Sequence, residues 1–406
     1  MKLEDRPASS TLCVHGGDRP DPATGAVEAP LHLASAFAFD DAAQAAGAFR
    51  GENEHFIYGR WGNPTVDALE QKIAALEAPG QGAAVPGIAA SATASGMAAI
   101  TATILTLCEA GDSIVAPRSM YGEAARLLRE RLPRFGITST FVDQTDPIEY
   151  ERAIGPRTKV IYVETPANPT LAITDLRAVT AIARARGIAV MADNTFATPY
   201  CQRPLAHGVD LVVHSMTKAL GGHGDAIGGV VVGDEARIRA IKETAIKSFG
   251  GVLSPFNALL VGRGVRTFAL RARQACATAS TLAHALAKHP RVRRVHYPGL
   301  EAHPGHAIAA RQMSAFGALL AFEVESLAHG RAVLEACRVV THAVSLGDVK
   351  SLITHPASTT HASMPASARV AAGIDDGLLR VSCGIEDTED VVADLLAALD
   401  HAARVV

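Results

Sequence analysis

The sequence lacks the features that mark membrane, secreted and zinc-binding proteins. Its longest apolar stretch, around residues 97–107, is shorter than the ~20 residues that cross a bilayer, and charged residues precede any apolar run at the N-terminus. The six cysteines form no CxxC motif and no cluster with histidines. These absences argue against a membrane anchor, a secretion signal and a metal site, and they favour a reduced protein of the cytoplasm.

Charge bias and several catalytic motifs are missing as well. The chain has 38 basic and 41 acidic side chains, a formal net charge of -3, so its composition gives no reason to expect nucleic acid or an anionic membrane as a partner. The motifs HExxH, GxSxG and GxGxxG are absent, which argues against a zinc hydrolase, a serine hydrolase and a nicotinamide enzyme. With 406 residues, the chain can nevertheless bury a large core around an enzyme-sized cleft.

From about residue 64 onward, helix-period segments alternate with short apolar runs, a pattern typical of an α/β domain with a mainly parallel sheet. A helix is predicted over residues 66–77, where apolar residues recur on one face. Strands are predicted at residues 114–116, 139–142, 160–164, 189–192, 211–214 and 229–232. Most are continuously apolar, as strands covered on both faces should be.

Two other parts of the chain have different patterns. After residue 256, a long helical stretch over 258–288 and strand-like runs at 318–324 and 379–382 predict a smaller α+β domain. The first 58 residues show weak periodicity and several Pro and Gly residues, which indicates an extended arm rather than a packed unit. The expected organisation is therefore an N-terminal arm (1–58), a large domain (59–256) and a C-terminal small domain (257–406).

The segment VVHSMTKALGGHGD (212–225) places Lys218 directly after a predicted buried strand. Burial lowers the pKa of an ammonium group because the charged form loses its hydration, so the amine becomes a nucleophile toward an aldehyde. Taken alone, a solvated surface lysine is the more ordinary explanation.

Two further segments supply groups that complement this amine. In GIAVMADNTFATP (187–199) a strand ends at Asp193, where a carboxylate can keep a pyridine nitrogen protonated. In ATASGMAAITATIL (92–105) Ser95 and Gly96 open a helix, whose free N–H groups can bind phosphate. A turn aspartate and a helix cap are the ordinary explanations of each alone. Together with Lys218 they meet the requirements of pyridoxal 5'-phosphate (PLP).

A series of motifs then extends over nearly the whole chain: YGRWGNPT (58–65), ASGMAAI (94–100), YGE (121–123), ETPANPT (164–170), ADNTFATP (192–199), HSMTKALGGHGD (214–225), SLGDVKSLITHPASTTH (345–361) and LLRVSCGIED (378–387). In this content and order the chain resembles the Cys/Met-metabolism (trans-sulfuration) family of PLP-dependent enzymes. The family includes methionine γ-lyase, cystathionine γ-synthase, cystathionine lyases and O-acylhomoserine sulfhydrylases. The resemblance implies PLP-dependent fold type I, with a large PLP-binding domain and a smaller C-terminal domain.

The resemblance also implies the roles of individual residues. Lys218 would form the Schiff base with PLP and move the substrate α-proton, Asp193 would pair with the pyridine nitrogen, and Tyr121 would stack on the ring and act as acid or base. Further cofactor contacts are implied at Ser95, Gly96, Met97, Asn168, Ser215 and Thr217.

Other implied roles concern the substrate and the assembly. Arg380 would clamp the substrate carboxylate with its guanidinium fork, assisted by Ser345. Tyr58 and Arg60 would reach the PLP phosphate of a neighbouring subunit, so a dimer would be the smallest active unit and a homotetramer of two such dimers is expected.

The activity implied by the resemblance is γ-elimination from a sulfur-containing or homoserine-derived L-amino acid, as in methionine γ-lyase, which forms 2-oxobutanoate, ammonia and a thiol. Val344 and Ile57 stand where cystathionine-specific relatives tend to carry glutamate, and apolar residues there favour the methyl thioether of methionine. Glu123, however, stands where methionine γ-lyases carry cysteine.

Three alternatives remain open at this stage. Lys350 stands where O-acylhomoserine sulfhydrylases often have lysine, which favours γ-replacement by such an enzyme or by a cystathionine γ-synthase. Glu123 at the pocket entrance could receive a cationic substrate tail, such as that of canavanine. A PLP-binding protein without catalysis is the third alternative. The presence of Lys218, Asp193, Tyr121 and Arg380 argues against it.

Overall fold

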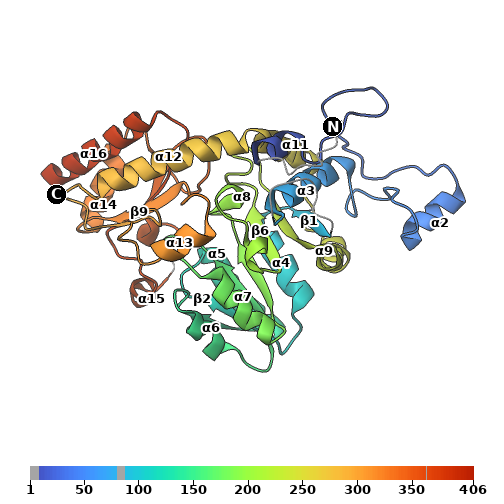
Figure 1. Cartoon of the computed structure of the whole chain (residues 1–406), viewed down its shortest axis with the longest axis horizontal. Helices are drawn as coiled ribbons and strands as arrows, with labels where there is room; N and C mark the ends of the chain where they lie inside the picture. The colour runs from blue at the N-terminus through green and yellow to red at the C-terminus, as the bar shows by residue number, and fades with distance from the viewer. Residues whose placement is uncertain (1–8, 80–86, 363) are drawn as a thin grey trace.

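Two β-sheets, each covered by helices, form the body of the chain in the computed structural model, which describes residues 9–79, 87–362 and 364–406 (Figure 1). The larger sheet contains seven strands in the order β1-β7-β6-β5-β4-β2-β3, and the smaller contains five in the order β10-β11-β12-β9-β8. Among the described helices, none has both the length and the apolar character needed to cross a membrane.

The larger sheet is mainly parallel, as predicted. Its strands are β1 (Ile88–Thr93), β2 (Ser113–Pro117), β3 (Thr138–Val142), β4 (Thr158–Glu164), β5 (Ala189–Asp193), β6 (Leu211–Ser215) and β7 (Gly229–Asp234). Only β7 runs antiparallel to its neighbours β1 and β6. All six predicted strands are confirmed, whereas β1 was missed because its sequence IAASAT contains only one large apolar residue.

Both faces of this sheet are buried, which explains the continuously apolar strands. Along β6, Val212 packs into one core layer and Val213 into another on the opposite face, and the neighbouring pair Ile161 and Tyr162 of β4 does the same. The helices around this sheet are α3 (Pro64–Glu77), α4 (Gly96–Leu107), α5 (Gly122–Arg126), α6 (Pro147–Ala153), α7 (Leu176–Ala185), α8 (Thr198–Cys201), α9 (Glu235–Ile241), α10 (Lys247–Phe249) and α11 (Pro255–Arg266). The predicted helix over 66–77 is confirmed as α3.

The smaller sheet and its helices form the C-terminal part of the chain. Its strands are β8 (Arg294–His296), β9 (Leu319–Glu323), β10 (Thr341–His342), β11 (Leu352–Thr354) and β12 (Leu378–Ser382). Its helices are α12 (Phe268–Leu286), α13 (His306–Gln312), α14 (Leu327–Ala336), α15 (Ala366–Ala371) and α16 (Thr388–Val405). The predicted strands at 318–324 and 379–382 correspond to β9 and β12.

The helical stretch predicted over residues 258–288 is confirmed, but it is interrupted at Thr267, between α11 and α12. The cause is a long-range contact. A Cβ atom at Gly264 would lie 2.1 Å from the carbonyl oxygen of Gly221, so the helix end is pressed against the loop that follows Lys218. Arg271 then donates from Nη2 to the Gly264 carbonyl and from Nη1 to that of Ala219, which holds the two segments together.

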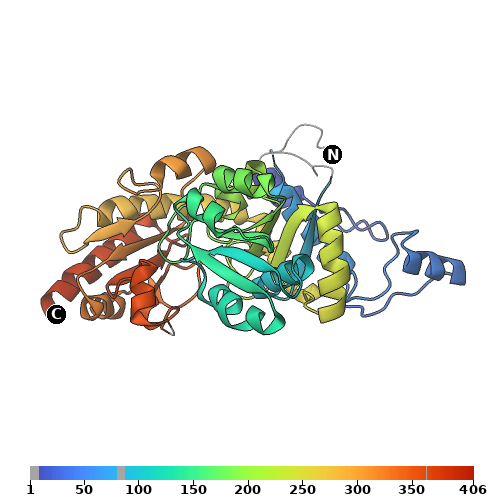
Figure 2. The same cartoon turned by 90° about the horizontal axis from the view of Figure 1, so that it is seen from below.

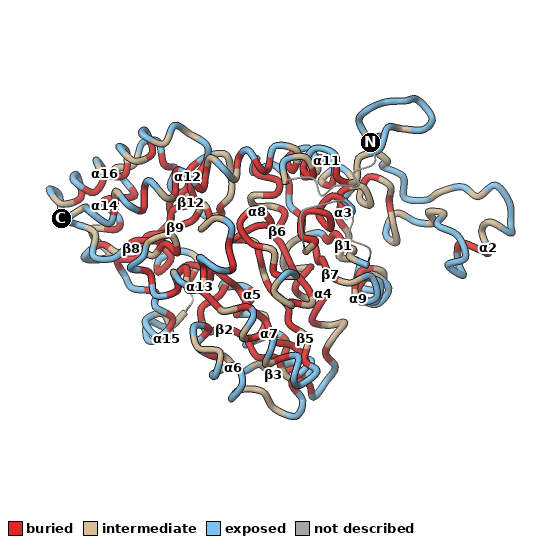
Figure 3. The backbone as a smooth tube through the Cα atoms, viewed as in Figure 1, coloured by how far each residue is buried: buried red, intermediate tan, exposed pale blue. Residues whose placement is uncertain are grey.

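The N-terminal region is only partly the extended arm that we expected. Residues of α1 (Ser9–His15) pack into the core, where Leu12 and Cys13 are fully buried. The buried ammonium of Lys72 donates to the carbonyl oxygens of Cys13 and Val14 and so holds this helix against α3. Beyond it, the chain up to α2 (Ala42–Arg50) projects from the body and is largely exposed (Figures 2 and 3).

Candidate active site

A cavity of about 610 Å³ lies at the carboxyl ends of β4, β5 and β6, where ligands of α/β sheets usually bind. The start of α4 and residues 344–346, 359–360 and 380 of the C-terminal part close it. The lining includes these predicted site residues: Ser95, Gly96, Met97, Tyr121, Asn168, Asp193, Ser215, Thr217, Lys218, Val344, Ser345 and Arg380. We call Glu164, Asn168, Asp193, Lys218 and Arg380 the inner wall, and Ile227 and Val344 the rim.

Lys218 presents its amine to this cavity from the turn that follows β6. Its Nζ atom donates to Ser345 Oγ at 2.6 Å. Burial, and then the charge of Arg380, lower the pKa of Lys218, so the neutral amine becomes more accessible than in an ordinary lysine. Ser345 has a φ of 89°, a conformation that residues with a side chain rarely adopt.

Asp193 is the last residue of β5. Its Oδ1 atom accepts from the Thr195 N–H at 2.9 Å, and its Oδ2 atom lies 3.4 Å from the Tyr162 hydroxyl. Burial raises the pKa of Asp193, whereas the Thr195 bonds and the nearby His214 lower it. A cationic ring nitrogen beside this carboxylate would favour its charged form further.

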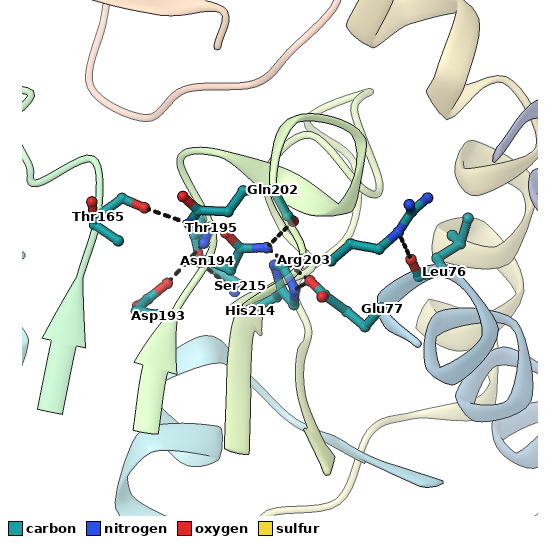
Figure 4. A network of polar contacts seen from close by, with 10 residues as sticks. All are labelled: Leu76, Glu77, Thr165, Asp193, Asn194, Thr195, Gln202, Arg203, His214 and Ser215. Carbon is teal, nitrogen blue, oxygen red and sulfur yellow. Dashed lines mark hydrogen bonds and ion pairs between the residues drawn. The ribbon is translucent and has the colours of Figure 1, made fainter. Parts of the chain in front are cut away.

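A buried polar network lies behind Asp193 (Figure 4). One oxygen of Glu77, at the end of α3, lies 2.5 Å from Nε2 of His214 and accepts from Nδ2 of Asn194 at 2.8 Å. His214 precedes Ser215 and Asn194 follows Asp193, so Glu77 holds the ends of β5 and β6 together. The Ser215 N–H also donates to Thr195 Oγ1, which adds a second link between these strand ends.

The start of α4 forms a cradle that fits a phosphate group. Ser95 caps the helix by accepting from the Ala98 N–H, which leaves the first N–H groups of the helix for an anion. A Cβ atom at Gly96 would lie 2.9 Å from Cβ of Ser215 and would fill this space. Thr217 Oγ1 exchanges hydrogen bonds with Gly228 on the opposite side of the turn.

Arg380 is buried and points its guanidinium into the cavity from β12. Its Nη1 atom donates to Asn168 Oδ1 at 2.9 Å and its Nη2 atom to the Ser345 carbonyl at 2.7 Å. Burial lowers the pKa of Arg380 to about 10. Within the described residues no carboxylate pairs with it, and its Nε atom has no hydrogen-bond partner, so a carboxylate ligand would satisfy a buried cation.

Four predicted site residues lie outside this cavity in the single chain. Ile57, Tyr58 and Arg60 belong to the end of the arm, where Arg60 donates to the Lys247 carbonyl. Glu123 is exposed at the start of α5, with an oxygen 3.9 Å from Arg126 Nη1. None of the four therefore contacts the inner wall from its own chain.

The cavity also contains residues that the sequence analysis did not single out. They are Ile100, Glu164, Thr195, Phe196, Ile227, Leu346, Thr359 and Thr360. Glu164 was visible in the motif ETPANPT as an acid at the end of a predicted strand next to that of Asp193, and this position could have indicated it.

Comparisons with known proteins agree with this geometry. The model of the Cys/Met metabolism PLP-dependent enzyme family matches residues 10–400. The chain belongs to this family. It is therefore a PLP-dependent enzyme of fold type I, and the amine, the carboxylate and the phosphate cradle described above are the groups that such a cofactor needs.

Individual family members are similar over almost their whole length. The L-methionine gamma-lyase of Porphyromonas gingivalis is 43% identical over 98% of this chain and 99% of its own. The cystathionine beta-lyase of Coxiella burnetii is 44% identical over 96% of this chain and 97% of its own. The solved structure of cystathionine gamma synthase from Xanthomonas oryzae pv. oryzae superposes with a TM-score of 0.92 at 40% identity and covers 99% of this chain and 100% of its own.

Among the residues that the structure describes, no group of three or more His, Cys, Asp or Glu side chains is arranged to hold a metal ion.

Proposed function

We propose that this family member is a γ-lyase that acts on L-methionine or a closely related sulfur-containing L-amino acid and releases 2-oxobutanoate, ammonia and a thiol. The observation that carries this proposal is the contrast within one cavity between an apolar rim and the buried Arg380, which pairs with no carboxylate of the described residues. Arg380 suits the carboxylate of an amino acid, and Ile227 and Val344 suit a short thioether rather than a second charged group. The similarity to L-methionine gamma-lyases supports it.

The cavity would hold the cofactor and the substrate through separate residues. Lys218 would bind the cofactor covalently, Asp193 would hold its ring nitrogen and Tyr121 would cover its ring, with Asn168 at the ring edge. Ser95, Gly96, Met97, Ser215 and Thr217 would bind its phosphate. When bound, PLP supplies an electron sink that stabilises a carbanion at the substrate α-carbon.

Proton movement would depend on two side chains. Lys218 has a lowered pKa and, once released by the incoming amino acid, can take a proton from the α-carbon as a neutral amine. Its bond to Ser345 keeps the amine on the Arg380 side of the cavity, next to the bound carboxylate. Tyr121 has a raised pKa because of burial and of nearby carboxylates, so at neutral pH it carries a proton that it can give to the leaving sulfur.

Association with a second copy would complete the site, and we propose a homotetramer built from two such dimers in the cytoplasm. Tyr58 and Arg60 lie away from the cavity of their own chain, at the base of the projecting arm. Such a position suits residues that act on a neighbouring subunit. We also propose to divide the chain into an arm (1–58), a PLP-binding domain (59–256) and a small domain (257–406).

A second candidate function is γ-replacement, in which an external thiol captures the intermediate, as in a sulfhydrylase or a cystathionine γ-synthase. The similarity to the cystathionine gamma synthase structure favours it. The exposed Lys350, outside the lining of the cavity, gives it no support from geometry.

A substrate panel on the purified holoenzyme tests the proposal. L-Methionine, L-cystathionine and O-acetyl- and O-succinyl-L-homoserine, each with and without sulfide, would be assayed for 2-oxobutanoate and for thioether or homocysteine products. Rapid 2-oxobutanoate formation from methionine alone is expected. Silence with methionine, together with sulfide-dependent homocysteine formation, would replace the proposal by γ-replacement.

A further inference from the structure

Glu164 is a buried carboxylate in the inner wall to which the sequence analysis assigned no role. It ends β4 and is only 3% exposed. Its register partner on the neighbouring strand is Asp193, so the two acidic side chains leave adjacent parallel strands at the same level of the sheet. Burial, and then the charge of Asp193, raise the pKa of Glu164, whereas the hydrogen bonds that it accepts from the Tyr121 and Asn168 backbones lower it. A buried acid next to another acid is unfavourable unless other contacts hold it.

The contacts that hold Glu164 come from two different segments. Its Oε1 atom accepts from the N–H of Asn168 at 2.8 Å, and its Oε2 atom accepts from the N–H of Tyr121 at 2.9 Å. Tyr121 follows β2 and lies 43 positions earlier in the chain, whereas Asn168 lies four positions later. One side chain therefore ties together the backbones of two residues that line the cavity.

Only a carboxylate of this length meets both requirements. Its two oxygens are both acceptors, whereas glutamine has one acceptor and one donor and would turn an N–H group toward another N–H group. Aspartate keeps the charge, but it is one methylene shorter and cannot reach both N–H groups from the same backbone position.

We propose that Glu164 is a positioning residue, which fixes the backbones of Tyr121 and Asn168 at the separation that the cofactor ring requires. The proposal rests on the proposed roles of Tyr121 and Asn168 as contacts of the PLP ring. It adds a link to Arg380 as well, because Asn168 Oδ1 accepts from Arg380 Nη1 and a displaced Asn168 would displace the guanidinium.

The test compares Glu164→Gln and Glu164→Asp with the wild-type holoenzyme by two readouts that need no substrate: the visible circular dichroism of bound PLP and the dissociation constant of PLP. Each variant would lose at least one of the two hydrogen bonds to the Tyr121 and Asn168 backbones, so we expect PLP to bind about tenfold more weakly and its dichroism band to fall by about half. Because neither readout needs turnover, inactivity toward methionine would refute the proposed function without affecting this result.

Asp394→Asn is the matched control. The two oxygens of Asp394 accept from backbone N–H groups of Arg338, Val339 and Val340, so this carboxylate also ties a loop, but at α16 and outside the cavity. We expect the control to change neither readout, even where it lowers the melting temperature.

Three results would overturn the proposal. In the first, both Glu164 variants keep the dichroism band and the PLP affinity within twofold of wild type. In the second, Glu164→Asp behaves as wild type while Glu164→Gln does not, so that charge rather than reach would matter. If neither variant folds, amide hydrogen exchange of the wild-type holoenzyme is measured instead, and we expect both the Tyr121 and the Asn168 amides to be protected. The third overturning result would be exchange of either amide at the rate of an open loop.

Discussion

The inner wall and the rim of the cavity are built in different ways. Every inner-wall residue donates or accepts at least one hydrogen bond from another part of the chain, and Glu164, Asn168 and Arg380 are each less than 5% exposed. On the rim, Val344 is 59% exposed and Ile227 is 58% exposed, and both are apolar. Hydrogen bonds thus fix the positions of the inner-wall residues, whereas the exposed rim residues have few contacts that restrict a change of side chain.

This difference separates two aspects of function. A residue held by several buried hydrogen bonds cannot change without disturbing its partners, so the inner wall suits chemistry that all members of an enzyme family share. An exposed apolar residue can be exchanged at little cost in stability, so the rim suits the selection of substrate. Mutations in the inner wall should therefore alter the rate with every substrate, and mutations in the rim should alter the ratio between substrates.

The largest effect is expected for Lys218→Ala. Loss of the amine would remove both the proposed covalent hold on PLP and the proposed base at the α-carbon, so kcat should fall roughly 10³-fold or more with methionine and cystathionine alike. Steady-state 2-oxobutanoate formation measures it. Lys159→Ala, at an exposed lysine of β4, is the control. A loss confined to one substrate would contradict the assignment of Lys218 to the shared chemistry.

Arg380→Lys should have the next largest effect. Lysine keeps the charge but loses the fork that can bind a carboxylate with two parallel bonds, so kcat/KM should fall about 10- to 100-fold for each substrate. Arg157→Lys, at an arginine paired with Asp112, is a control for the exchange itself.

Arg380 can also be tested through pH. Its charge helps to lower the pKa of Lys218, so Arg380→Gln should raise that pKa and Arg380→Lys should not. Because only the neutral amine attacks the PLP aldehyde, reconstitution of the glutamine variant's apoenzyme should require a higher pH than in wild type. Stopped-flow absorbance across a pH series measures this, and an unchanged midpoint would show that burial alone sets the pKa of Lys218.

Val344→Glu probes the rim. A carboxylate there gives the distal ammonium of cystathionine a partner, and at such an exposed position it should raise the cystathionine-to-methionine ratio of kcat/KM by about fivefold. Val344→Gln has a similar size without the charge and should leave the ratio close to wild type. Equal ratios in the two variants would remove the rim from substrate selection.

The smallest effect is expected for Glu123→Gln. Glu123 is exposed and already faces Arg126, so its loss should lower kcat/KM for canavanine relative to methionine by only about twofold. Glu130→Gln removes the other carboxylate beside Arg126 and serves as the control. If the two variants give the same ratio, a role of Glu123 in binding cationic substrates would be abandoned.

Features that depend on local pattern were predictable from the sequence. The strands β4, β5 and β6 are continuous apolar runs because both faces of the sheet are covered, and their ends placed Asp193 and Lys218 correctly at one edge. The helix α3 followed from its apolar face and from Pro64 at its start. The cofactor itself could be inferred because the amine, the carboxylate and the phosphate cradle fall within one α/β domain.

Features that depend on distant contacts were not predictable. The break at Thr267 arises where Gly264 meets Gly221, and the burial of α1 depends on Lys72, far from it in the chain. Likewise, the motif ETPANPT shows Glu164 without showing that Tyr121 is its partner. Local periodicity carries no information on such pairs.

Helix α3 connects the exposed N-terminal arm with the buried strand ends at the active site. At its start, the Asn63 side chain donates to the His32 carbonyl and the Thr65 hydroxyl to that of Pro30, so the first turn is hydrogen-bonded to the arm. At its end, Glu77 forms hydrogen bonds with Asn194 and His214, which are next to Asp193 and Ser215. The 14 residues of α3 form one continuous helix about 21 Å long, without an intervening loop. Hydrogen bonds at its two ends thus make α3 the link between the arm and the strand ends that carry Asp193 and Ser215.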